Sequence, residues 1–391
     1  MVSFIGTQLT TVAAPVQIYA LTRSSFAVGL LGLVQIVPLV IGSLIGGGFA
    51  DAYDRRRLLL IAQFPLMATS AGLAFNAMSH APHVWLIYAF SALASAFAGL
   101  DSPTRAAATP TLVARDRVPS AIALMQLVMQ TGLVVGPALG GVLIAAFSVS
   151  AAYWLDVVSF TAAIGALLLM APMAPAGGGT RASAGSILEG LRFLNGRRAV
   201  QGTFVIDINA MVFGMPRALF PALGLTVFGG TAATVGLLYA APGAGAFVGA
   251  IFSGWLRVVD RAGRGVIYAV LAWGAAITVF GVVHWLPLAL VMLAVAGAAD
   301  MVSAVFRNSV LQLSVPDRLR GRLSSIHIAV VTGGPRLGDL EAGTVAALAN
   351  PTFAVASGGL ACMAGVGVIT KLLPELAHWR LSDHTVAPVD D

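Results

Sequence analysis

Long apolar stretches alternate with short polar loops along the whole chain. A helix that crosses a bilayer needs about 20 apolar residues, because the hydrocarbon layer is about 30 Å thick and each helical residue rises about 1.5 Å. Twelve stretches have this length and character. They are residues 2–21, 26–50, 58–79, 84–104, 120–146, 148–172, 202–227, 232–256, 266–284, 286–309, 323–347 and 352–373. The pattern therefore predicts an all-α integral membrane protein with twelve transmembrane helices.

The composition is typical of an integral membrane protein. Hydrophobic residues make up 58% of the 391 residues, charged residues make up 10%, and the mean hydropathy is +0.90. A soluble domain carries about 25% charged residues. The single cysteine, Cys362, allows no internal disulfide and no thiolate metal cage. The sequence contains no HExxH, P-loop or GxSxG motif, so we expect no enzymatic activity, no metal site and no cofactor.

The basic residues predict the orientation in the membrane. Of the 22 Lys and Arg residues, Arg23 alone lies in one set of loops, and Arg217, Arg307 and Arg336 lie within spans. The others all lie in the alternate loops or in the C-terminal tail. Because cytoplasmic loops carry the excess of Lys and Arg, we expect a multi-pass protein of the cytoplasmic membrane with both termini in the cytoplasm. The basic loops then contact lipid headgroups, and the net charge of +6 does not indicate nucleic-acid binding.

The two halves of the chain repeat each other. The stretch from Gly29 to Arg57 and the stretch from Gly236 to Arg264 have the same length, both begin Gly-Leu-Leu, and both place glycines at the same offsets. Each span therefore corresponds to the span six places later and runs in the same direction, which defines a parallel repeat.

The repeat predicts the domain organisation. We expect six-helix bundles over residues 1–172 and 201–374, a cytoplasmic linker over 173–200 and a cytoplasmic tail over 375–391. Residues 187–194 of the linker have amphipathic spacing and are expected to lie along the membrane surface. Two such bundles suit alternating access, in which one bundle rocks against the other around a site at the midplane.

The loop after the second span carries a recognisable motif. It reads Gly-Gly-Phe-Ala-Asp-Ala-Tyr-Asp-Arg-Arg-Arg over residues 47–57 and resembles the signature of the major facilitator superfamily at this place. Its Asp-Arg-Arg form is similar to the branch of enterobactin and multidrug exporters. The resemblance covers essentially the whole chain and implies a cytoplasmic latch between the halves. The implied latch residues are Gly47, Asp51, Asp54, Arg55 and Arg56.

The fifth span carries a second motif, made of Gly132, Gly136, Pro137, Gly140 and Gly141. The spacing G-x-x-x-G-P-x-x-G-G is similar to the signature of proton-coupled exporters in the superfamily. Glycines four residues apart allow a neighbouring helix to approach closely, and proline bends the span. Small-residue packing alone would also explain the pattern.

Ionisable residues within spans are costly and usually line a cavity or pair with one another. In the superfamily, spans 1, 4, 7 and 10 line the central cavity, and three of these spans carry an aspartate here. The candidates for the proton-coupling pathway are Asp300, Asp207, Asp101, Arg105, Arg307 and Arg217. Asp300 is the first choice as proton carrier because it lies nearest the midplane. The alternative is a set of static salt bridges that hold the helices together.

Three charged residues of span 11 and one of span 6 complete the set. We expect Arg336, Asp339 and Glu341 to form a network at the interface of the halves. Asp156 in span 6 is expected to be structural, because the resemblance implies a peripheral position for that span.

The resulting expectation is a secondary transporter that exports small amphipathic molecules, drug-like or siderophore-like, by alternating access with proton antiport. Its partners would be the small-molecule substrate, protons and membrane lipid, and we expect a monomer. A nutrient importer of the same fold is the alternative, followed by a membrane sensor or scaffold that does not transport.

Overall fold

The computed structural model describes residues 2–173, 192 and 194–383. The predicted amphipathic helix over 187–194 and the end of the tail therefore lie almost entirely outside the described residues. Within the described part of the chain every regular element is helical.

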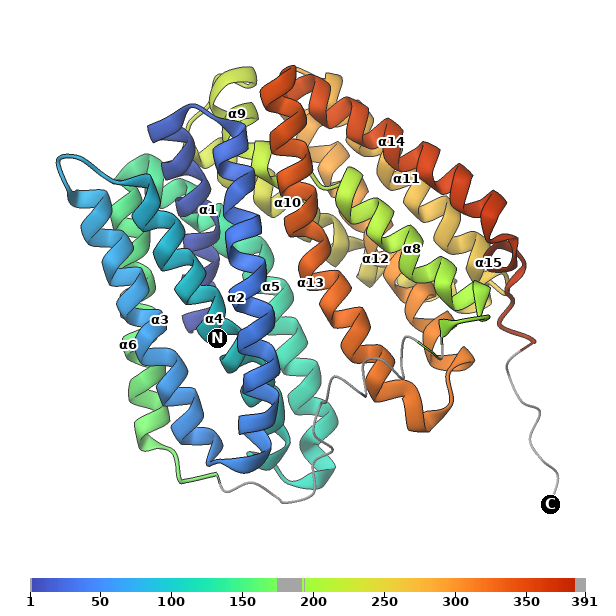
Figure 1. The fold of residues 1–391 in the computed structure, drawn as a ribbon, viewed down its shortest axis with the longest axis horizontal. Helices are drawn as coiled ribbons and strands as arrows, with labels where there is room; N and C mark the ends of the chain where they lie inside the picture. The colour runs from blue at the N-terminus through green and yellow to red at the C-terminus, as the bar shows by residue number, and fades with distance from the viewer. Residues whose placement is uncertain (1, 174–191, 193, 384–391) are drawn as a thin grey trace. The chain divides into compact units, whose positions relative to one another are not determined.

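The first half of the chain forms six long helices, which Figure 1 shows in blue to green. They are α1 (Val2–Thr22), α2 (Ser25–Ala52), α3 (Arg55–Met78), α4 (Val84–Ala108), α5 (Val118–Ala146) and α6 (Val149–Leu169). Polar side chains in the loops set several of the starts, since Ser24, Asp54 and Ser148 each accept a hydrogen bond from a backbone N–H in the first turn of the next helix.

The second half repeats this arrangement, except that short helical segments replace the end of span 7 and follow α10. Its elements are α8 (Arg198–Phe213), η3 (Arg217–Leu219), α9 (Phe220–Ala222), η4 (Leu223–Val227), α10 (Ala232–Ile251), η5 (Ser253–Val258), α11 (Ala262–Val282), α12 (Leu286–Ser314), α13 (Asp317–Leu348), α14 (Pro351–Leu372) and α15 (Pro374–His378). Among the described residues, ten helical segments are long and apolar enough to cross a membrane. The other two predicted spans coincide with α1, of 21 residues, and with α13, of 32 residues.

The seventh predicted span, residues 202–227, is interrupted where the sequence suggested a continuous helix. Regular structure stops after Phe213 and resumes at Arg217, because Pro216 has no N–H to donate and Gly214 is a weak helix former. The freed backbone groups find side-chain partners. The indole Nε1–H of Trp273 donates to the Gly214 carbonyl at 2.7 Å, and the Ala218 N–H donates to Asp339 at 2.8 Å.

The chain divides into two compact units. The first unit comprises residues 1–182 together with 220–240, and the second comprises 183–219 together with 241–391. The C-terminal part of span 7 and the N-terminal part of span 8 thus belong to the first unit. The domain boundaries at 172, 200 and 374 remain a prediction.

Close helix pairs build the first unit. α2 packs along α4, α3 lies between α4 and α6, and α1 packs against α5 and α6. Gly42 and Gly99 let α2 and α4 touch backbone to backbone, since a Cβ atom on either glycine would clash with the main chain of the other helix.

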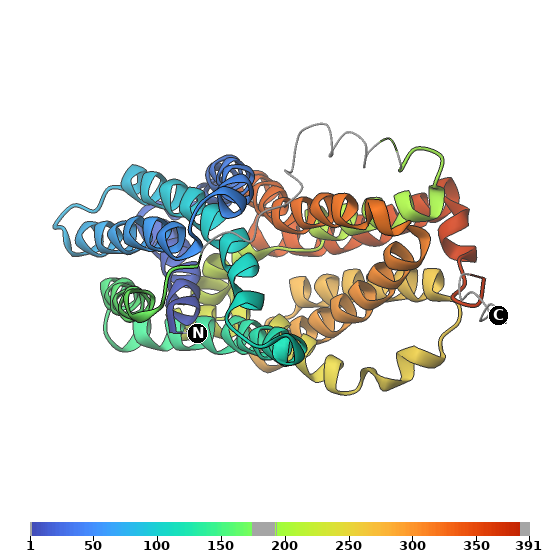
Figure 2. The ribbon, with the colours of Figure 1, turned by 90° about the horizontal axis from the view of Figure 1, so that it is seen from below.

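The second unit has its own core. α11 packs against α12 and α14, while α8 packs against α13 and α14, and Figures 1 and 2 show α8 in green beside the orange and red helices. The C-terminal segment, residues 374–382, closes one end of this core. Leu376 and Trp379 are buried in it, and the Leu381 N–H donates to the Asp260 carbonyl at 2.8 Å.

The contact between Asp260 and the C-terminal segment predicts sensitivity to acid. Hydrogen bonds from the backbone N–H and side chain of Ser382 lower the pKa of Asp260. A carboxyl whose pKa is lowered in the folded state stabilises it above the ordinary pKa, and that contribution is lost as the pH falls through the folded value. The segment should therefore loosen in acid.

Asp260→Asn tests this contact at neutral pH, because it replaces a charge-assisted hydrogen bond by a weaker neutral one. Hydrogen–deuterium exchange should rise over residues 379–382 and stay the same in α14. Equal exchange in the variant and the wild type would show that the carboxylate does not hold the segment.

Candidate functional site

Three charged side chains of the second unit form a cluster in which two carboxylates share one cation. Arg307 of α12 is buried between Asp207 of α8 and Asp300 of its own helix. Its Nη1 lies 2.5 Å from Asp207 Oδ1, and its Nη2 lies 3.6 Å from Asp300 Oδ1. The side chains of Arg307 and Asp207 are 5% and 2% exposed, whereas that of Asp300 is 38% exposed.

This asymmetry separates the roles that the two carboxylates can take. Asp207 is held closely by Arg307 and shielded from solvent. Asp300 is only loosely engaged, since 3.6 Å exceeds a hydrogen-bond distance, and it is open to its surroundings. Asp300 is therefore the member of the cluster whose pairing with Arg307 can change while Arg307 stays partnered by Asp207.

A second group of charges lies at the interruption of span 7. Asp339 of α13 accepts the hydrogen bond from the Ala218 N–H in η3, and Arg336 donates to the Thr332 carbonyl at 2.7 Å. The charge of Arg217 acts on both Asp339 and Asp300, so Arg217 connects this group to the Arg307 cluster.

The charged residues of span 11 make contacts that the sequence did not indicate. The Asp339 carboxylate bonds to the backbone of another span, and Arg336 bonds to the backbone of its own helix. Glu341 is half-buried and makes no hydrogen bond or ion pair with the other described residues. Membership of these residues in an interface network remains a prediction.

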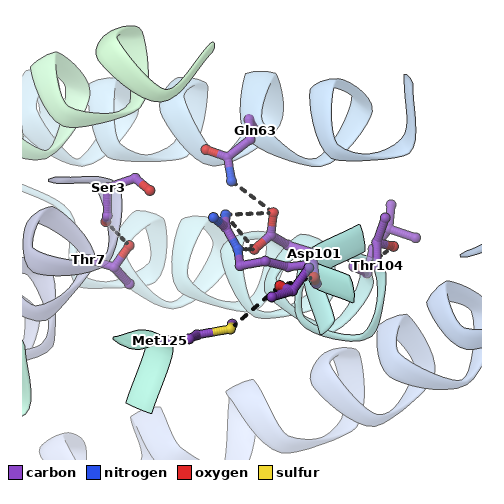
Figure 3. A network of polar contacts seen from close by, with 9 residues as sticks. Ser3, Thr7, Gln63, Asp101, Thr104 and Met125 are labelled. Atoms are coloured by element: carbon purple, nitrogen blue, oxygen red, sulfur yellow. Dashed lines mark hydrogen bonds and ion pairs between the residues drawn. The ribbon is translucent and has the colours of Figure 1, made fainter. Parts of the chain in front are cut away.

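The first unit holds a bidentate ion pair, drawn in Figure 3. Arg105 donates through Nε and Nη2 to both oxygens of Asp101, at 2.9 to 3.1 Å. Gln63 of α3 adds a third donor, with its Nε2 at 2.8 Å from Asp101 Oδ1. The spacing of four residues predicted the pair, but Gln63 was missed. The only signal for it was one amide within an apolar span.

The loop between α2 and α3 is held within the first unit. Asp54 caps α3 by accepting from the Arg57 N–H at 3.1 Å. Arg56 donates to the carbonyls of Leu167 and Leu168 at the end of α6, at 2.8 and 2.7 Å, where a cation also complements the helix dipole.

The other residues of the predicted latch are Arg55, Gly47 and Asp51. Arg55 is buried, and its N–H donates to the Met173 carbonyl. Gly47 and Asp51 lie in the last two turns of α2. A latch between the halves remains a prediction, and the contacts that are present join α3 to α6.

The span-5 glycines have two packing partners. Gly132, Gly136 and Gly140 face Phe4, Gln8 and Leu9 of α1. Gly141 faces the opposite way and meets the backbone of Ala232 and Gly236 in α10. Added side chains at Gly136 or Gly141 would clash with these neighbours, so the motif gives α5 close contact with both helices.

Because Arg307 is the cation shared by Asp207 and Asp300, its removal should greatly lower the stability of the protein. Arg307→Met leaves Asp207 buried without a partner, and removal of one partner from a buried pair costs about 3–5 kcal/mol. Adding Asp207→Asn should restore part of the loss. The measurement is thermal unfolding of the purified protein in detergent.

Arg198→Met is the matched control, because its ion pair with Glu375 is exposed and should change stability little. If Arg307→Met unfolds at the same temperature as Arg198→Met, Asp207 does not depend on Arg307.

Comparisons with known proteins agree with this architecture. The family of transmembrane secretion effectors matches residues 1–387. The enterobactin exporter EntS of Escherichia coli (strain K12) is 30% identical over 390 residues, which span 100% of this chain and 93% of EntS. EntS of Citrobacter koseri is 30% identical over 379 residues, covering 97% and 91% of the two chains.

Solved structures of transporters share the fold. A bacterial homologue of the human lysosomal transporter Spinster, inward-facing, has a TM-score of 0.71 at 16% identity and covers 99% of this chain and 96% of its own. A POT-family transporter in complex with 5-aminolevulinic acid has a TM-score of 0.73 at 11% identity, with 96% and 95% covered. The predicted all-α fold of twelve helices in two repeats is confirmed. The chain matches the family of transmembrane secretion effectors and is similar to enterobactin exporters over its whole length. It therefore belongs to the major facilitator superfamily, in the branch of these exporters.

Proposed function

We propose that this protein exports siderophore-like or drug-like amphipathic molecules across the cytoplasmic membrane by alternating access, in exchange for protons. The observation that carries the proposal is the similarity to enterobactin exporters over the whole chain. The span-5 motif supports the exporter over the importer alternative, since its glycines are all present and form close helix contacts.

Asp300 is the proposed proton carrier. An ionised Asp300 shares Arg307 with Asp207, whereas a protonated Asp300 leaves Arg307 to Asp207 alone. Both states keep Arg307 paired, so the proton can come and go without leaving a buried cation uncompensated. Movement of the helices that changes access to Asp300 would then load the proton on one side of the membrane and release it on the other.

The other pathway residues take supporting roles in this proposal. Asp101 is held by both Arg105 and Gln63, so it ranks behind Asp300 and Asp207 as a proton carrier. Arg217, beside the interruption of span 7, would attract an anionic group of the substrate. The basic loops, with the latch residues among them, would lie on the cytoplasmic side in contact with lipid, with both termini on that side and the protein as a monomer.

The test is transport of enterobactin in proteoliposomes with an imposed pH gradient. Wild-type protein should move substrate faster with the gradient than without it. Asp300→Asn should abolish the acceleration while leaving exchange of substrate down its own gradient, because the amide cannot carry the proton.

Asp116→Asn is the matched control, since Asp116 lies exposed in the loop before α5 and should keep the coupling. Acceleration that persists in Asp300→Asn would contradict the role of Asp300. Absence of enterobactin transport in the wild type would contradict the substrate class.

A further inference from the structure

One buried carboxylate takes no part in the pathway described above. Asp156 lies in the eighth position of α6, which has 21 residues, and is 1% exposed. This places it at depth within the first unit.

Hydroxyl groups are the hydrogen-bond partners of Asp156. Its Oδ2 accepts from Thr10 of α1 at 2.9 Å and from Ser70 of α3 at 2.7 Å. Its Oδ1 lies 3.3 Å from the hydroxyl of Ser159, one turn further along α6. Gly6 closes the site, because a Cβ atom there would clash with Asp156 and Ser159. Three helices therefore meet at this carboxyl group.

The helices around Asp156 offer no cation at this depth. α1 and α5 contain no Lys, Arg, His, Asp or Glu, and Asp156 is the only such residue in α6. The arginines of α3 are confined to its first turn, and Arg57 precedes Ser70 by 13 residues, or about 20 Å along a helix. Arg105 of α4 is engaged by Asp101. One turn before Asp156, Tyr153 donates to Gln17.

An ionised carboxylate in such a place would be expensive. Burial of a charge without a partner of opposite sign costs several kcal/mol, and ordinarily the group neutralises instead. Hydroxyl partners suit a group that binds and releases a proton, because they donate to a carboxylate and accept from a carboxylic acid. A guanidinium, by contrast, can only donate.

A sodium ion is a poorer fit to the same oxygens. The hydroxyls of Thr10 and Ser70 already lie at hydrogen-bond distance from Oδ2, which leaves no gap for an ion between them and the carboxylate. Both distances are those of direct O–H···O bonds.

We propose that Asp156 is a second proton-binding site, occupied at neutral pH while α1, α3 and α6 are packed together, and separate from the Asp300 cluster. Movement of α1 would withdraw Thr10 and Gly6 and admit water, which would favour release of the proton. A contribution of that proton to transport rests on the proton antiport proposed above. Binding of a proton to Asp156 does not depend on that proposal.

Infrared difference spectroscopy tests occupancy without transport. Purified wild-type protein minus Asp156→Asn, at neutral pH, should show the C=O band of a protonated carboxyl group and no carboxylate bands. Asp116→Asn, an exposed control, should remove carboxylate bands only. A wild-type minus Asp156→Asn spectrum with carboxylate bands would overturn the proposal.

Thr10→Val provides the same test if Asp156→Asn does not fold. Loss of the hydroxyl should shift the frequency of the protonated C=O band, and a shift confined to the carboxylate region would overturn the proposal. Loss of the protonated band on adding sodium chloride, but not choline chloride, would assign the site to sodium instead. If transport fails while the C=O band of protonated Asp156 is present, the antiport mechanism is contradicted and the proton site at Asp156 is not.

Discussion

A charge inside a hydrocarbon layer has no water to solvate it, so each ionised group within the spans needs a partner from the protein. This constraint explains why helices far apart in the sequence meet where they do. Arg307 of α12 meets Asp207 of α8, and Asp339 of α13 meets the backbone at the interruption of span 7. At the end of α6, Arg56 satisfies carbonyls that would otherwise lack donors. Small residues allow other close approaches, as where the glycines of α5 meet α1 and α10.

The two units provide partners for their buried charges in different ways, and the difference suggests different roles for the two units. In the first unit, Asp101 is bound on both oxygens and Asp156 is enclosed by hydroxyls. In the second, Arg307 is shared by two carboxylates, and one of them, Asp300, is partly open. A shared cation with one loosely held partner can change its pairing at little cost, whereas a bidentate pair cannot. The proposed coupling to a proton gradient is therefore better placed in the second unit, and the proposed proton site at Asp156 is the more deeply buried one in the first.

Local patterns in the sequence were enough to place the helices, because span length depends only on bilayer thickness and apolar composition. They also predicted the pair of Asp101 and Arg105, whose spacing puts both on one helix face. Pairings between helices could not be predicted, since they depend on which helices are neighbours and how each is rotated. Asp207 and Arg307 lie 100 residues apart, and the hydroxyls around Asp156 come from three spans. The interruption of span 7 was also missed, because proline is tolerated in many membrane helices. The partners that satisfy the broken backbone, Trp273 and Asp339, come from other helices.

Proton release on substrate binding measures most directly whether buried carboxyl groups and substrate share one cycle. Enterobactin would be added to detergent-solubilised wild-type protein in a weakly buffered solution, with binding followed separately by calorimetry. Antiport through these groups requires that binding displaces protons, so the solution should acidify in proportion to the substrate bound. Saturable binding with no change in pH would contradict the coupling of transport to these carboxyl groups.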